Sequence, residues 1–156
     1  MAASLMRMAS RVPMLVLCRR LLSDQLTPVL GYRRLVAPDD RTAPSFLFES
    51  VENGSAVGRW SMLGAQPAVE VLARGSLVEE RDRRTGEVRR TESADPLEVL
   101  RARGARYAPQ AIDAVPAAFH GGWVGYASFD AVRWLEPAKL PFSAAPHDDR
   151  GLPDLH

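Results

Sequence analysis

The stretch AVEVLARGSLVEERDRRTGEVRRT, residues 68–91, decides the fold class. Two glycine-containing turn signals, Gly75-Ser76 and Thr85-Gly86, divide it into short segments. The first segment, 68–72, is apolar enough for a strand. The two segments that follow, Leu77–Arg84 and Glu87–Thr91, alternate polar and charged residues in the manner of edge strands. The stretch therefore predicts a strand followed by a β-hairpin.

Short strands and short helices are mixed on both sides of this stretch. Two helices are predicted to begin on one capping pattern, a Thr or Asp followed by proline at the first helical position. The predicted helices start at Thr27-Pro28 and at Asp95-Pro96, with the second covering 96–104, and a shorter one covers Asp130–Leu135. Further strands are predicted at Ser45–Val51, Trp60–Leu63 and Phe119–Phe129. Because the order is not regular β-α-β alternation, the predicted fold class is α+β, with antiparallel sheets and packed helices.

The composition is that of one soluble globular domain. The chain has 156 residues, of which 46% are hydrophobic and 25% charged, with a formal net charge of +1. Nineteen of the twenty basic residues are arginine, but many stand beside acids, so an arginine-rich nucleic-acid binder is disfavoured. The single cysteine, Cys18, excludes an internal disulfide framework and a cysteine-based zinc site. No apolar run approaches the ~20 residues that cross a bilayer.

Residues 1–22 differ in composition from the rest of the chain. They contain four arginines and no acid, and the first acidic residue is Asp24. An acid-free segment with arginine, serine and alanine is typical of an organelle transit peptide. The alternative is an ordinary first element of the fold that happens to lack acids. The predicted division is therefore a transit-peptide-like leader over 1–22 and a folded domain over 23–156.

The usual catalytic residue patterns are missing. The three histidines, His120, His147 and His156, do not have a metal-ligand spacing. The glycine-rich segment 121–126 is neither a P-loop nor a dinucleotide fingerprint, and close packing of a strand explains it. The sequence supports no complete active site.

The segment Ser45–Val51 combines an aromatic face with a hydroxyl. In a strand, Phe46, Phe48 and Ser50 share one face while Leu47, Glu49 and Val51 share the other. A hydroxyl that continues an aromatic face can line a small apolar pocket and donate to a bound polar group. The alternative is a strand end that turns into solvent.

Six segments of the chain, taken in order, match one known family. They are Ser23–Leu30, Ala43–Glu52, Gly58–Pro67, Gly121–Tyr126, Leu140–Ser143 and Asp148–Asp154. In these segments the chain resembles the N-terminal domain of anthranilate synthase component I, a chorismate-utilising family. The resemblance covers about residues 12–156 and is greatest to the plant-type enzymes.

The resemblance implies the first step of tryptophan synthesis. In that family, chorismate and ammonia give anthranilate and pyruvate, with Mg²⁺ and with ammonia supplied from glutamine by an amidotransferase subunit. The catalytic residues and the metal belong to a later domain of that family. For this chain the resemblance therefore predicts no catalytic residue and no cofactor. It also predicts that the chain is inactive by itself and forms an incomplete version of the family fold. It also predicts an exposed apolar surface, and a plastid (chloroplast stroma) location.

The resemblance further implies a feedback site for tryptophan. Ser50 would contact the bound tryptophan, Glu49 would receive its amino group, Pro28 would form part of the wall beside the indole, and Arg59 would be a basic group near the pocket. Two alternatives stay open: the N-terminal region of aminodeoxychorismate synthase, and a stand-alone, non-catalytic module that binds tryptophan or a subunit. No nucleic-acid or membrane partner is expected.

Overall fold

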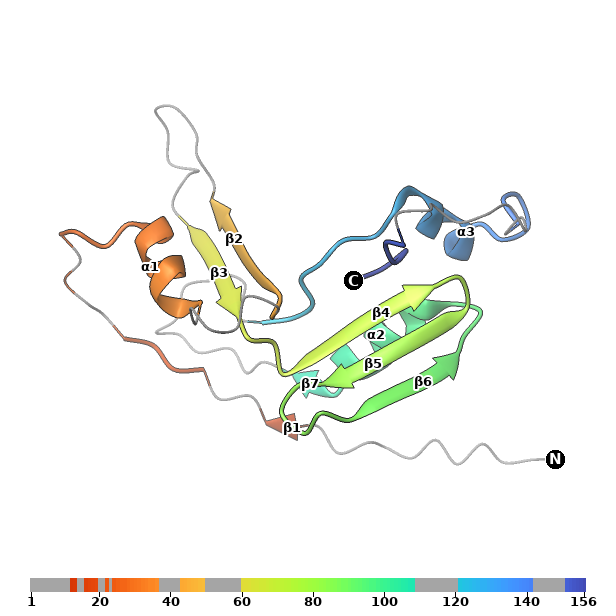
Figure 1. Cartoon of the computed structure of the whole chain (residues 1–156), viewed down its shortest axis with the longest axis horizontal. Helices are drawn as coiled ribbons and strands as arrows, with labels where there is room; N and C mark the ends of the chain where they lie inside the picture. Colours follow the sequence, from red (N-terminus) through yellow and green to blue (C-terminus); the bar gives the residue numbers. More distant parts are fainter. Residues whose placement is uncertain are drawn as a thin grey trace.

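The computed structural model describes residues 12–13, 16–19, 22, 24–36, 43–49, 60–108, 121–141 and 151–156. Over these residues the chain is an α+β protein with short helices and antiparallel sheets, as predicted from the sequence (Figure 1). No helix in these ranges is long and apolar enough to cross a membrane.

A three-stranded antiparallel sheet forms the centre of the described structure. Its strands, β4 (Val69–Arg74), β5 (Leu77–Asp82) and β6 (Val88–Glu92), follow one another in space as in sequence. The predicted hairpin is thus confirmed, but the prediction that both of its strands are edge strands is wrong for β5, which is central. The charges on β5 are accommodated there because they pair with arginines. Glu80, for example, forms an ion pair with Arg103.

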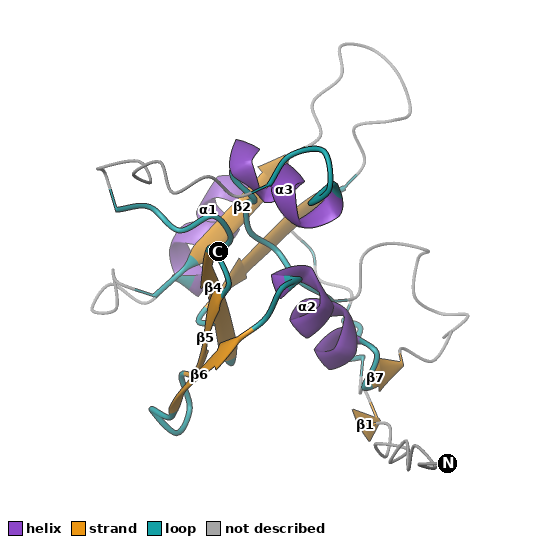
Figure 2. Ribbon diagram, turned by 90° about the vertical axis from the view of Figure 1, so that its right-hand side faces the viewer, coloured by secondary structure: helices purple, strands orange, loops and turns teal. Residues whose placement is uncertain are grey.

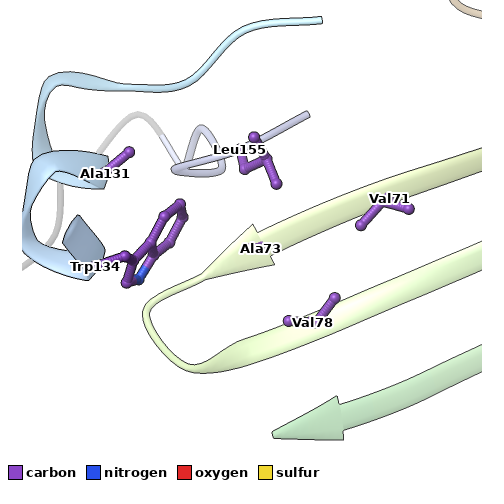
Figure 3. Close-up of a cluster of buried hydrophobic side chains, with 6 residues drawn as sticks. All are labelled: Val71, Ala73, Val78, Ala131, Trp134 and Leu155. Atoms are coloured by element: carbon purple, nitrogen blue, oxygen red, sulfur yellow. The ribbon is translucent and has the colours of Figure 1, made fainter. Parts of the chain in front are cut away.

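Helix α2 (Pro96–Gly104) packs on one face of this sheet (Figure 2). Its predicted cap is present: the Asp95 carboxylate accepts a hydrogen bond from Leu97 N–H at 3.0 Å. Apolar residues of the sheet, of the 3₁₀ turn Phe129–Ala131, of helix α3 (Val132–Leu135) and of the C-terminal segment form the core cluster shown in Figure 3. Its buried members are Val71, Ala73, Val78, Ala131, Trp134 and Leu155.

A second, two-stranded antiparallel sheet carries helix α1 (Pro28–Leu35) on one face. Its strands are β2 (Ser45–Glu49) and β3 (Ser61–Ala65). The Thr27 hydroxyl caps α1 by accepting from Leu30 N–H at 3.2 Å, as the Thr-Pro pair predicts. The Tyr32 hydroxyl lies 2.6 Å from Ser45 Oγ and joins the helix to β2.

The glycine-rich segment departs from its prediction. Of the strand predicted at Phe119–Phe129, Phe119 and His120 lie outside the described residues, and 121–129 contains only one isolated β-bridge, at Ala127. Gly121 and Gly122 have φ of 145° and 151°, a conformation that other residues rarely adopt. The predicted helix after it is confirmed as a 3₁₀ turn, Phe129–Ala131, followed by α3, Val132–Leu135.

The two ends of the described chain both join the fold. Strand β1 (Val12–Pro13) pairs in parallel with β7 (Tyr107–Ala108), although Val12 and Pro13 fall within the range 1–22 assigned to a leader. At the other end, Leu155 bridges both Ala73 and Ala127. The sequence shows no pattern that predicts either pairing.

Candidate functional site

An apolar hollow of about 290 Å³ lies beside the two-stranded sheet. The residues that line it come from β2, β3 and the glycine-rich segment. They are Phe46, Phe48, Met62, Trp123, Val124 and Gly125. None of them is charged, so this hollow suits an apolar or aromatic group and offers no acid or base for catalysis.

The first wall of the hollow follows from the alternation of side chains along β2. Phe46 and Phe48 point to the same face, as predicted, and their ring centroids are 5.3 Å apart. Across the ladder, Phe46 pairs with Gly64 and Phe48 with Met62. The Phe46 ring covers Gly64 so closely that a Cβ there would lie 2.9 Å from Phe46 Cζ. A side chain at position 64 would therefore displace the aromatic wall.

The second wall is held by contacts distant in sequence. The Trp123 indole N–H donates to the Leu100 carbonyl of α2 at 3.1 Å, and the indole packs over Gly104. Gly125 lies against the backbone of His156, whose carbonyl carbon would be 2.7 Å from a Cβ at position 125. Two glycines thus permit the close approaches that position this wall.

The four residues predicted to bind tryptophan are only partly described. Ser50 and Arg59 lie outside the described residues. Glu49 is the last residue of β2 and is exposed; by alternation it shares the face of Ser45, the side on which α1 packs. Pro28 is the first residue of α1 and is half-buried. The structure therefore places Glu49 and Pro28 on the helix side of the sheet and the hollow on the opposite side.

The residues Met62, Trp123, Val124 and Gly125 were not predicted as site residues. The sequence signals only the glycine-rich aromatic segment, and its local pattern predicts a strand and not a pocket wall. Their contribution depends on Trp123 reaching α2 and on Gly125 reaching His156, and neither contact can be inferred from local pattern.

The charged side chains with perturbed pKa values lie away from the hollow, on the three-stranded sheet and α2. Hydrogen bonds from Arg81, then from Arg90, lower the pKa of the Glu79 carboxyl, against some desolvation. The pKa of Asp82 is lowered mainly by a backbone hydrogen bond from Thr85. These groups stabilise the hairpin and do not converge on a cavity with the geometry of a catalytic pair.

The described residues also contain no group of three or more His, Cys, Asp or Glu side chains that could hold a metal ion. A second hollow, about 260 Å³, lies at the β5–β6 turn between Arg81, Arg83 and Val88. Arg81 pairs with Glu79, and Arg83 pairs with the buried Glu70 at 2.7 Å, so this hollow does not present a free cationic site.

Fold and site together define an α+β segment with an apolar hollow and, in its described part, no assembled catalytic group. Comparison with known proteins is more specific. The chain is 52% identical over 145 residues to the anthranilate synthase alpha subunit 1, chloroplastic, of Oryza sativa subsp. indica, a match that covers 91% of this chain and 25% of that protein. It is 52% identical over 143 residues to the alpha subunit 2, chloroplastic, of Arabidopsis thaliana, covering 90% of this chain and 23% of the relative.

The bacterial relatives are more distant. The anthranilate synthase component 1 of Mycolicibacterium smegmatis is 36% identical over 137 residues, which covers 88% of this chain and 24% of that protein. No family model and no solved structure matches the chain. The chain is thus homologous to part of anthranilate synthase component I, most similar to the plant alpha subunits among these relatives, and spans about a quarter of their length.

Proposed function

We propose that this chain forms the tryptophan-responsive N-terminal part of an anthranilate synthase component I. The observation that carries the proposal is 52% identity to plant alpha subunits over nine-tenths of the chain. The complete enzyme converts chorismate and ammonia to anthranilate and pyruvate, with an amidotransferase subunit that releases the ammonia from glutamine. The described residues supply no catalytic pair and no metal-binding cluster, so the proposal assigns neither catalysis nor Mg²⁺ to any of them. It further holds that the chain makes no anthranilate by itself.

The proposed ligand site lies at the end of β2. The apolar hollow on the Phe46 and Phe48 face supports it, since an indole ring needs aromatic and aliphatic walls. Ser50 continues that face by the alternation of the strand. The hollow supports only the part of the proposal that concerns Ser50, because Glu49 and Pro28 lie on the helix side of the sheet, opposite the hollow. The proposed roles of Glu49 for the ammonium group of tryptophan, of Arg59 for its carboxylate and of Pro28 beside the indole rest on the family resemblance. Feedback inhibition requires that tryptophan bind the inactive state more tightly, by a coupling free energy of about 1–3 kcal/mol.

A chimera tests this proposal most directly. The rice alpha subunit, with this chain in place of its matching segment, is assayed for anthranilate fluorescence against increasing tryptophan. We expect inhibition by tryptophan, and Ser50→Ala should raise the inhibitory concentration about tenfold or more while leaving the uninhibited rate unchanged. Ser76→Ala is the matched control, because Ser76 is an exposed serine in the β4–β5 turn and belongs to neither strand of the proposed site. Inhibition of the Ser50 variant at the original tryptophan concentration would refute the site.

We also propose a plastid location. The plant relatives carry the word chloroplastic in their names, and residues 1–22 have the acid-free, arginine-bearing composition of a transit peptide. A fluorescent protein fused after His156 should accumulate in chloroplasts of leaf protoplasts. Replacing Arg7 and Arg11 with glutamate should leave it in the cytosol, and equal chloroplast accumulation of both fusions would contradict the proposal.

A further inference from the structure

The first strand of the fold lies inside the segment that has the composition of a transit peptide. Val12 and Pro13 form β1, which pairs in parallel with Tyr107 and Ala108 of β7. Figure 2 shows these two short strands next to each other, beyond helix α2. The paired residues are far apart in the sequence, so a tertiary contact and not a local pattern positions β1. A leader that is removed from the protein cannot contribute this strand.

The partner of β1 is positioned by helix α2. β7 begins two residues after Ala105, the C-cap residue of α2, whose N–H donates to the Arg101 carbonyl at 2.9 Å. Leu97 and Leu100 of the same helix pack against the buried core cluster. The core therefore determines where β7 lies, and β1 pairs with an ordered part of the fold.

The segment between β1 and α1 contributes little burial of its own. Among its described residues, Leu17 is 85% exposed, Leu22 is 101% exposed, and Cys18 is exposed as well. In the described structure this segment connects β1 covalently to the rest of the chain. Removal of residues 1–22 would therefore detach β1 from its pairing with β7, whereas a cut before Val12 would preserve the pair.

The share of the chain that its relatives match also argues against a leader that extends to residue 22. The match to the rice alpha subunit 1 covers 91% of the chain, so about 14 of the 156 residues lie outside it. Since 14 is fewer than 22, at least about eight of residues 1–22 belong to the matched region. The match to the Mycolicibacterium smegmatis protein covers 88%, leaves about 19 residues outside, and so also includes part of 1–22. Because bacteria contain no plastids, plastid targeting does not explain residues shared with that protein.

We propose that a processing endopeptidase of the plastid cleaves this chain before Val12, and that the mature protein keeps β1. The proposal rests on the plastid location proposed above and adds the position of the cut. One peptide bond is hydrolysed: water supplies the oxygen of the new carboxylate on the leader and a proton for the new amino group of the mature chain. Arg7 and Arg11 leave with the leader, while Cys18 and Arg19 stay in the protein.

Import into isolated chloroplasts tests the position of the cut. The full chain, with a hexahistidine tag after His156, is imported and purified, and its N-terminus is determined from its intact mass. The first residue of the mature protein should lie between Ser4 and Val12. A first residue beyond Val12 would overturn the proposal and leave the plastid location intact. A chain inside the chloroplast that still begins at Met1 or Ala2 would also overturn it, and a chain that is not imported would contradict the location itself and the proposal with it.

The single cysteine of the chain gives a second measurement of the same boundary. Cys18 lies between a cut before Val12 and a cut after residue 22. Under denaturing conditions, a maleimide-linked polyethylene glycol should therefore add one label to the mature protein and shift it on a gel. Cys18→Ser is the control and should show no shift. A mature protein of the original chain that takes no label would show that Cys18 has been removed, and would refute the retention of β1.

The contribution of β1 to the fold is measured on purified chains by urea unfolding. A chain that begins at Val12, after an initiator methionine, should have the same urea midpoint as the full chain. A chain that begins at Ser23 should have a midpoint lower by roughly 0.5 M or more, because the pairing of β1 with β7 is lost. Equal midpoints for all three chains would show that β1 does not support the fold, and would overturn the proposal.

Discussion

Substituting Leu155 with alanine removes the side chain by which the C-terminal segment enters the core. Leu155 is 7% exposed and packs in the cluster of Val71, Val78 and Trp134. The substitution deletes three buried carbons at about 0.8 kcal/mol each, and the cavity left behind adds a further cost. Because the cluster is small and close to the surface, partial collapse keeps this cost low. We expect a loss of about 3 kcal/mol in the free energy of unfolding.

Urea unfolding followed by tryptophan fluorescence measures this loss. Leu152→Ala provides the matched control, because Leu152 is in the same segment but 59% exposed, so its loss should stay within about 0.5 kcal/mol. The slope of the free energy against urea should be the same in both variants if the transition is two-state. Equal, small losses for Leu155→Ala and Leu152→Ala would show that this segment is not docked on β4, and the reasoning from the core cluster would be wrong.

Three further substitutions have opposite or pH-dependent effects. Gly64→Ala should destabilise the chain by about 1–3 kcal/mol in urea unfolding, because the new methyl group collides with the Phe46 ring; a neutral result would contradict this packing. Gly31→Ala should instead stabilise it by about 0.5–1 kcal/mol, since Gly31 is inside α1 with no neighbour closer than 3.9 Å, and a loss would contradict that space. The Glu79 carboxyl, held by Arg81, has a lowered pKa, so its contribution is present above the unfolded value of about 4.5 and is lost as pH falls through the folded pKa. In the Glu79→Gln variant, the loss of stability on acidification, followed by circular dichroism, should therefore be smaller than in the original chain. An unchanged acid profile would refute the stabilising role of the Glu79 carboxylate.

The helices could be predicted well because their signals are local. Thr27 and Asp95 accept from backbone N–H groups two or three residues later, and the proline that follows each has the φ that a first turn needs. Such contacts span a few residues and need no partner from elsewhere in the chain. The alternation of Phe46 and Phe48 was predictable for the same reason.

The position of β5 in its sheet was not predictable from its own residues. Its polar alternation is typical of an edge strand, but the acids are neutralised by partners on other elements, as with Glu80 and Arg103 of α2. A strand with charges can occupy the centre of a small sheet when one face stays accessible to solvent. Which neighbour supplies the opposite charge is known only once the strands are paired.

The candidate site, too, was predictable from the sequence only in part. The aromatic face of β2 was evident from the sequence, while its opposite wall depends on Trp123 reaching Leu100 and on Gly125 reaching His156. Phe48 and Trp60 are 50% and 52% exposed, so part of the apolar surface near this wall is accessible to solvent. The positions of Ser50 and Arg59 relative to the hollow stay a prediction, since both lie outside the described residues.

The sequence by itself determined the α+β class, the start of each long helix, the turns of the hairpin and the family resemblance, because these depend on neighbours within a few residues or on the order of motifs. The tertiary structure alone decided which strand is central, which residues close the hollow, and that Leu155 bridges Ala73 and Ala127. The physical reason is that hydrogen bonds and burial between distant segments depend on how the whole chain packs, and no local pattern of side chains specifies the partner.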